Sequence, residues 1–145
     1  EINSEKLEEL LNLKEENNFN HLSDLAIKGE KDTTNKLLSH SNLDQEKSVL
    51  YLNIINKRLN KLRECLMQTK QTNIELIIDN LKPPVFWKDK PMLKNQIKKW
   101  NIEKIDKAIR ETYIIELQLK SNSSIDKNLL IKNTLLKVCN LANSA

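Results

Sequence analysis

The sequence predicts an all-α fold, a bundle of about five to seven helices, and three observations lead to this prediction. The chain of 145 residues has a single glycine, and its three prolines lie close together between Pro83 and Pro91, so long stretches on both sides run without a helix breaker. Apolar residues recur at every third or fourth position along these stretches, and no segment alternates as a half-buried strand does. Roughly 70% of the unfolded chain's surface can be buried at this size, so the core needs neither a disulfide nor a metal.

The N-terminal part predicts two helices joined by a polar segment. Residues 1–16 carry six Glu against two Lys, a composition typical of an acidic amphipathic helix. Residues 15–18 are expected to form a linker, with a domain boundary near residue 18. A second helix begins at Phe19 and ends at Gly29, which can adopt the left-handed conformation of a helix C-terminus. The apolar face of the first helix consists of Leu7, Leu10, Leu11 and Leu13.

The centre of the chain predicts a short helix from about Asp32 to His40 and then the longest helix, from Asn42 or Asp44 to Gln68. In the longest helix the apolar positions step by three or four residues, as on the buried face of a helix. These positions are Val49, Leu52, Ile55, Leu59, Leu62 and Leu66, and the basic residues Lys57, Arg58, Lys61 and Arg63 fall on the outer face.

The next helix begins near Thr72, because Thr72 and Glu75 have the spacing of a capping box. It stops before Pro83, since a residue that precedes proline is disfavoured in a helix. Residues 82–91 are therefore expected to be extended, and Pro91 suits the first position of a helix that continues to Trp100.

Two further helices complete the prediction. Asn101 is the expected N-cap of a helix to about Lys120, with Trp100 and Ile105 at the positions of a hydrophobic staple. Ser123 and Asp126 repeat the capping-box spacing before the last helix. The expected buried stripes are Ile102, Ile105, Ile109, Tyr113 and Leu117 in the first of these helices, and Ile131, Leu135, Val138 and Ala142 in the second.

The sequence shows no catalytic motif, so we expect no enzymatic activity, cofactor or metal site in this chain. A single glycine excludes the glycine-rich phosphate loops and the GxSxG hydrolase turn. His21 and His40 lie beside no ligand set or nucleophile, and Cys65 and Cys139 fall at apolar helix positions, where buried thiols are typical. No signal peptide or membrane span is evident, and we expect a cytoplasmic protein with reduced thiols.

The segment 82–99 combines six lysines and one acid with the aromatic residues Phe86 and Trp87. Basic residues interleaved with aromatic rings can hold single-stranded nucleic acid by phosphate attraction and base stacking. In the alternative interpretation Val85, Phe86 and Trp87 fill the core beneath an irregular crossover, and the lysines are only solvated. The candidate contacts to single-stranded DNA are Phe86, Trp87, Lys88 and Lys90.

Residues 82–120 resemble a known family, the C-terminal part of the delta subunit of the bacterial DNA polymerase III clamp loader. That family has a proline-rich aromatic turn, a basic helix that ends in Trp, and a helix that ends in an acid-Leu-x-Leu-Lys pattern. The matching pieces here are residues 83–91, residues 92–100 and Glu116-Leu117-Gln118-Leu119-Lys120. The upstream half is compatible with the family, including the step Gly29-Glu30.

The resemblance implies a domain organisation and a set of partners. Residues 1–18 correspond to the end of an AAA+ lid domain, and residues 19–145 correspond to the helical collar that joins the loader subunits in a pentameric ring. The implied partners are the gamma/tau and delta-prime subunits, with primed DNA contacted weakly or indirectly. The element that binds the sliding clamp belongs to an upstream domain of the family, and the parent subunit does not hydrolyse ATP.

We therefore expect a subunit-assembly role in DNA replication. The last two helices carry apolar residues outside the expected stripes, and contiguous exposed apolar surface is typical of an interface. A stand-alone helical module that binds nucleic acid through residues 82–99 is the alternative. The candidate interface residues are Ile114, Ile115, Leu129, Leu130, Leu136 and Leu141.

Overall fold

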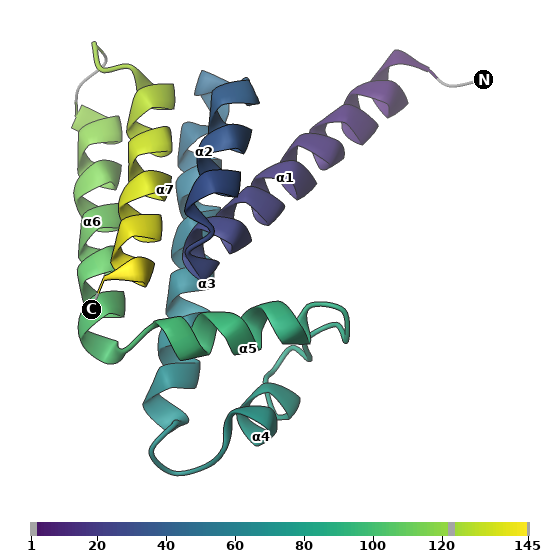
Figure 1. Cartoon of the computed structure of the whole chain (residues 1–145). Helices are drawn as coiled ribbons and strands as arrows, with labels where there is room; N and C mark the ends of the chain where they lie inside the picture. Colours follow the sequence, from purple (N-terminus) through teal and green to yellow (C-terminus); the bar gives the residue numbers. More distant parts are fainter. Residues whose placement is uncertain (1–2, 122–123, 145) are drawn as a thin grey trace.

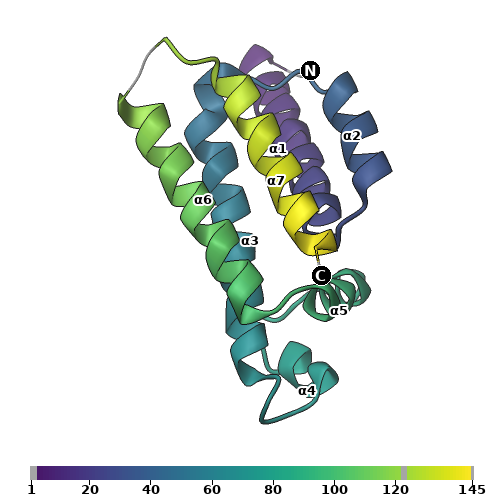
Figure 2. The same cartoon turned by 60° about the vertical axis from the view of Figure 1, so that its left-hand side comes forward.

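The computed structural model describes residues 3–121 and 124–144, and every regular element in these ranges is a helix, which confirms the all-α prediction. Helices α2, α3, α6 and α7 run side by side with the second half of α1, whereas α4 and α5 lie at one end of the bundle (Figure 1, Figure 2). The elements are α1 (Ser4–Lys28), α2 (Lys31–His40), the short 3-10 helix η1 (Gln45–Lys47), α3 (Ser48–Gln68), α4 (Ile74–Asp79), α5 (Lys90–Lys99), α6 (Ile102–Ser121) and α7 (Lys127–Asn143).

Helix α1 is continuous over 25 residues, so the linker expected at residues 15–18 is wrong. No Gly or Pro interrupts this stretch, and Lys47 Nζ binds Glu15 Oε2 at 2.7 Å, which holds the middle of α1 against the chain before α3. Residues 3–15 are nevertheless exposed, and burial begins at Phe19. Figure 1 shows the first half of α1 extending away from the bundle. The domain boundary near residue 18 stays a prediction. It lies next to Phe19, where burial begins.

The core lies between the second half of α1, α3, α6 and α7. Phe19 of α1 stacks on Tyr51 of α3 with ring centroids 4.4 Å apart, and both rings are buried. Burying one such large apolar side chain stabilises the fold by roughly 1.5 to 3 kcal/mol. Fully buried side chains from these four helices form the centre: Ile27, Ile55, Leu59, Leu62, Ile105, Ile131, Leu135 and Val138.

The helix ends follow the predicted chemistry with small shifts. Gly29 ends α1 with φ +85°, and the Asn101 side chain accepts from the Lys104 N–H at 2.8 Å, so both expected caps are confirmed. Asn73, rather than Thr72, caps α4 by accepting from the Leu76 N–H at 2.9 Å. Asp126 caps α7; Ser123, its expected partner, lies outside the described residues.

The buried face of α6 differs from the expected stripe. The expected stripe advanced by four residues at a time from Ile105, and each such step turns roughly 40° beyond a full helical turn. Tyr113 and Leu117 consequently point to solvent, 61% and 51% exposed, and Ile115 occupies the core at 5% exposed. Val49, the first residue of the expected α3 stripe, is also exposed. The buried positions of α6 are Ile105, Ala108, Thr112, Ile115 and Leu119, in alternating steps of three and four.

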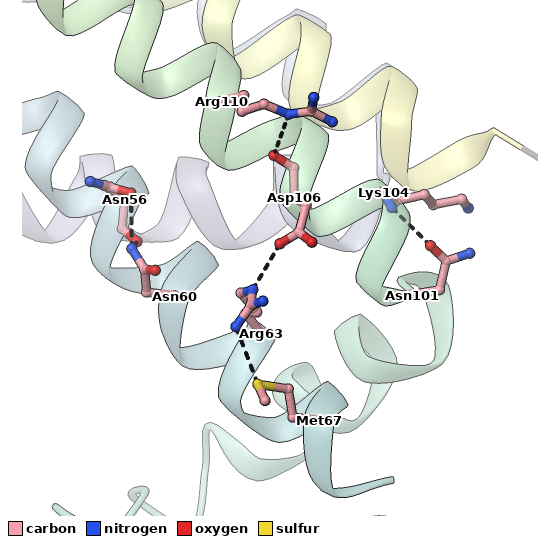
Figure 3. A network of polar contacts seen from close by, with 8 residues as sticks. All are labelled: Asn56, Asn60, Arg63, Met67, Asn101, Lys104, Asp106 and Arg110. Carbon is pink, nitrogen blue, oxygen red and sulfur yellow. Dashed lines mark hydrogen bonds and ion pairs between the residues drawn. The ribbon is translucent and has the colours of Figure 1, made fainter. Parts of the chain in front are cut away.

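A polar contact fastens α3 to α6 outside the core. Arg63 Nε lies 2.7 Å from Asp106 Oδ1, and Arg63 Nη1 also contacts Met67 Sδ at 3.2 Å (Figure 3). These two helices make the most extensive contact between elements of the described chain. The packing of α3 on α6 is therefore determined mainly by the apolar core, and the ion pair lies outside that core.

Candidate functional site

The irregular segment between α4 and α5 forms an exposed turn on a buried base. Leu81 is buried and Val85 packs half-buried against the core, so the segment is anchored at these two residues. The Lys82–Pro83 peptide bond is cis. The Asp89 N–H donates to the Phe86 carbonyl at 2.8 Å and closes the tip of the turn. Residues 86–88 therefore project from a fixed base.

Phe86 and Trp87 lie on the surface, 57% and 68% exposed. The interpretation that they fill the core is therefore wrong, and of the three apolar residues in this turn only Val85 packs against the core. The two rings have centroids 6.0 Å apart and are tilted by 46°, and Lys88 Nζ lies 5.5 Å from the centre of the Trp87 ring. The turn thus presents two exposed aromatic rings, and a cation lies over the Trp87 ring.

The lysines of segment 82–99 are not equivalent. Lys90 Nζ lies 2.9 Å from Asp79 Oδ1, and Lys94 Nζ lies 3.0 Å from Glu75 Oε1, so both lysines fasten α5 to α4. Their charges are partly neutralised, which weakens the prediction that Lys90 contacts DNA. Lys88 differs from both, because its Nζ lies over the Trp87 ring.

Two grooves flank the turn, and no pattern in the sequence indicates them. One groove of about 490 Å³ lies between α3 and Pro83, and a second of about 370 Å³ lies between α3 and Phe86. Lys61 of α3 lines both grooves. The basic face of α3 is visible in the sequence as lysines at helical spacing, but its place beside the turn depends on the tertiary fold.

The candidate interface residues of α6 and α7 divide into three groups. Ile114 and Leu129 are 47% and 55% exposed, whereas Ile115 is buried and cannot form part of a surface in this fold. Leu117, exposed as described above, lies three positions after Ile114 and four after the exposed Tyr113, so it neighbours both and extends the apolar strip along α6. The partly buried candidates, packed against the edge of the core, are Leu130, Leu136 and Leu141.

A groove of about 700 Å³ runs between α6 and α7 next to this strip. Its lining includes the apolar Ile114 and Leu141 and the basic Lys107, Arg110 and Lys137. Lys137 pairs with Glu111, which also lines the groove, at 3.3 Å, so its charge is partly neutralised. The strip and the groove together present an apolar surface edged with basic residues.

The first half of α1 presents a second unpartnered apolar face. Leu7, Leu10, Leu11 and Leu13 are each between 50% and 55% exposed. Residues 4–18 carry five Glu and two Lys, so this face is edged with acids. Where α1 meets the bundle, the hydrogen bond to Glu15 raises the pKa of Lys47 above its ordinary value.

Cys65 and Cys139 are buried free thiols, as expected, and burial raises the pKa of both thiols, which disfavours the nucleophilic thiolate. Within residues 3–121 and 124–144 no group of His, Cys, Asp and Glu could hold a metal ion. No helix in those ranges combines the length and apolar character needed to cross a membrane.

No family model, curated protein or solved structure matches the chain. The class of this protein is therefore defined by its fold, an all-helical bundle with an exposed basic aromatic turn and an exposed apolar strip.

Proposed function

We propose that this chain assembles with other subunits as the collar domain of a clamp-loader subunit, the delta subunit of a bacterial DNA polymerase III. The resemblance of residues 82–120 to that family implies the partners, gamma/tau and delta-prime. In this role the chain holds neighbouring AAA+ modules in order and has no catalysis or cofactor of its own. A replication subunit of this kind acts in the cytoplasm.

The exposed apolar strip of α6 is the observation that carries this proposal. Tyr113, Ile114 and Leu117 expose apolar surface on α6, and Leu129 of α7 is exposed as well. Contiguous exposed apolar surface usually marks a site of protein association. By the same resemblance, residues 1–18 belong to the lid domain, and the leucines on this half of α1 pack on the rest of that domain.

Co-purification with gamma/tau and delta-prime tests the proposal. The chain is expected to bind these subunits without ATP and at a salt concentration that screens charge, because the contact is apolar. Ile114→Glu with Leu117→Glu is expected to abolish the association. Leu76→Glu on α4, where the native leucine is 51% exposed, is the matched control and should leave it unchanged. Retention of the sliding clamp alone, or loss in the control only, would contradict the proposal.

Binding of single-stranded nucleic acid is a second candidate function, favoured by the exposure of Phe86 and Trp87. Exposed aromatic rings beside lysines provide stacking surfaces for unpaired bases. Such binding is expected to be weak, without sequence preference and sensitive to salt, because only a few phosphates are neutralised. Within the clamp-loader proposal this turn would contact the primed DNA.

A further inference from the structure

We infer that a single-stranded nucleic acid lies across α3 and the turn between α4 and α5, a path that extends well beyond the turn itself. Its phosphates contact Lys57, Lys61 and Lys82. Its bases stack on Phe86 and Trp87. This inference rests on the second candidate function and adds a role for α3, whose basic residues were expected only on the outer face of a helix.

One face of α3 carries an uninterrupted series of polar and basic side chains. Residues three and four positions apart are neighbours on a helix surface, so this series forms one stripe. Ile55 and Leu59, on the opposite face of α3, are fully buried, so the stripe is directed outward. Its members are Asn53, Asn56, Lys57, Asn60 and Lys61.

The two grooves beside the turn connect this stripe to the aromatic rings. The first groove is lined by Lys57, Lys61 and Lys82, and the second by Lys61 and Phe86. Because Lys61 lines both, a strand that follows the stripe reaches the Phe86 ring without leaving basic surface. The neighbouring Trp87 ring, 6.0 Å from Phe86, can take a second base.

The charges near the grooves favour phosphate contact at α3 rather than at α5. Within the described residues no ion pair involves Lys57, Lys61 or Lys82. Arg58, by contrast, is engaged with Asp24 at 2.8 Å, as the lysines of α5 are with the acids of α4.

The acids that line the two grooves are Asp24, Glu64 and Asp89. Asp24 is neutralised by Arg58. The two remaining acids, Glu64 and Asp89, therefore offset two of the three positive charges of Lys57, Lys61 and Lys82. The net charge of the two grooves therefore remains positive. The negative charges of the two acids weaken the attraction for phosphate.

The asparagines of the stripe supply hydrogen-bond donors. Asn60 Nδ2 donates to the Asn56 carbonyl at 2.9 Å and to Asn56 Oδ1 at 3.0 Å. Figure 3 shows the side-chain nitrogen of Asn56 turned away from Asn60. Amide donors of this kind commonly contact phosphate and sugar oxygens and position a strand without reading its sequence.

Fluorescence anisotropy with labelled oligonucleotides tests the path. The probes are single strands of about ten nucleotides, as DNA and as RNA, together with a DNA duplex of the same length. The test variant is Lys57→Gln with Lys61→Gln. The matched control is Lys31→Gln with Lys36→Gln, which makes the same charge change on α2, a helix that lines neither groove. Circular dichroism verifies that each variant keeps its helix content.

The test variant is expected to weaken single-strand binding and to lower the slope of log K against log salt by about 1.4, since each neutralised phosphate contributes about 0.7 for single strands. Trp87→Ala is expected to weaken binding by about 5-fold to 140-fold at unchanged salt slope, as the loss of one stacked base does. Glu64→Gln is expected to strengthen binding, because it removes from the groove a negative charge that repels phosphate. Either DNA or RNA as the better single strand supports the inference.

The failures are distinguishable. If Trp87→Ala weakens binding while the test and control lysine pairs behave alike, the path along α3 is wrong and the second candidate function stands. If no variant changes the binding of single strands, both are wrong. Duplex that binds as tightly as single strand overturns the inference as well, because bases in a duplex are already stacked on one another.

Discussion

The indole Nε1–H of Trp100 donates a hydrogen bond to the backbone carbonyl of Ile27, with 2.6 Å between the two atoms. The last four carbonyls of a helix lack partners within it. At the end of α1, the carbonyls of Leu25 and Ala26 accept from the N–H groups of Glu30 and Gly29. The indole satisfies the carbonyl of Ile27, and it ties the junction of α5 and α6 to the end of α1.

Trp100→Phe is expected to lower the free energy of unfolding by about 1 to 3 kcal/mol, because it leaves a buried carbonyl without a donor. Trp100→Ala is expected to cost about 3 to 5 kcal/mol, since it also opens a cavity. Urea unfolding followed by circular dichroism measures both. A Phe variant as stable as the unmodified chain would show that the hydrogen bond contributes nothing to stability.

Gly29→Ala is expected to destabilise the chain by roughly 1 to 2 kcal/mol, the cost of left-handed backbone for a residue with a Cβ. Gly29 has φ +85°, and an added Cβ would lie 2.8 Å from Asn143 Oδ1 at the end of α7. The unfolding midpoint reports the change. Gly29→Asn, which tolerates this backbone better, should lose less; an equal loss in both would assign the effect to the contact with Asn143 alone.

Most of the fold was predictable because its signals are local. Helix caps such as Asn101 and Gly29 act within a few residues, and the periodicity of α3 placed Ile55 and Leu59 correctly in the core. The linker at residues 15–18 was mistaken because polar residues are equally suited to a solvated helix. Whether such residues form a linker or part of a helix depends on the helical segments that flank them on both sides.

The candidate site was less predictable, because it depends on contacts distant in the sequence. An irregular turn has no periodicity, so nothing in the order of Val85, Phe86 and Trp87 indicates which residue faces the core. In α6 the steps of four residues accumulate roughly 80° between Ile105 and Tyr113, which exchanged Ile115 with Tyr113 between core and surface. The approach of Lys61 to the turn follows only from the packing of the whole bundle.

The ion pair between Arg63 and Asp106 is expected to contribute less than about 1 kcal/mol to stability, because both side chains are more than one third exposed. A double-mutant cycle with Arg63→Met and Asp106→Asn measures the coupling. The coupling should shrink further as salt is raised. A coupling free energy above about 1 kcal/mol that does not depend on salt would contradict this expectation. It would mean that the ion pair is less accessible to water than the exposure of the two side chains indicates.

Stability is expected to fall as the pH rises past the pKa of an unfolded thiol, about 8.5. Burial raises the pKa of Cys65 and of Cys139 in the folded chain. Above pH 8.5 or so the unfolded chain therefore binds fewer protons than the folded chain, which makes the slope of stability with pH negative. Urea midpoints across this range should fall less steeply in a Cys65→Ala, Cys139→Ala variant. An unchanged slope would assign the alkaline loss to other groups.

Replacement of the turn aromatics is expected to leave the fold nearly unaffected. Phe86 and Trp87 are more than half exposed, and the buried base of the turn is formed by Leu81 and Val85. Phe86→Ala and Trp87→Ala should each change the free energy of unfolding by no more than about 0.5 kcal/mol, the usual range for surface positions. Trp100→Ala provides the contrast, since it removes the same side chain from a buried position. Thermal and urea unfolding of the three variants side by side decide the matter: a loss at Trp87 comparable to that at Trp100 would place the ring in the core and remove the stacking surface on which the nucleic-acid proposal depends.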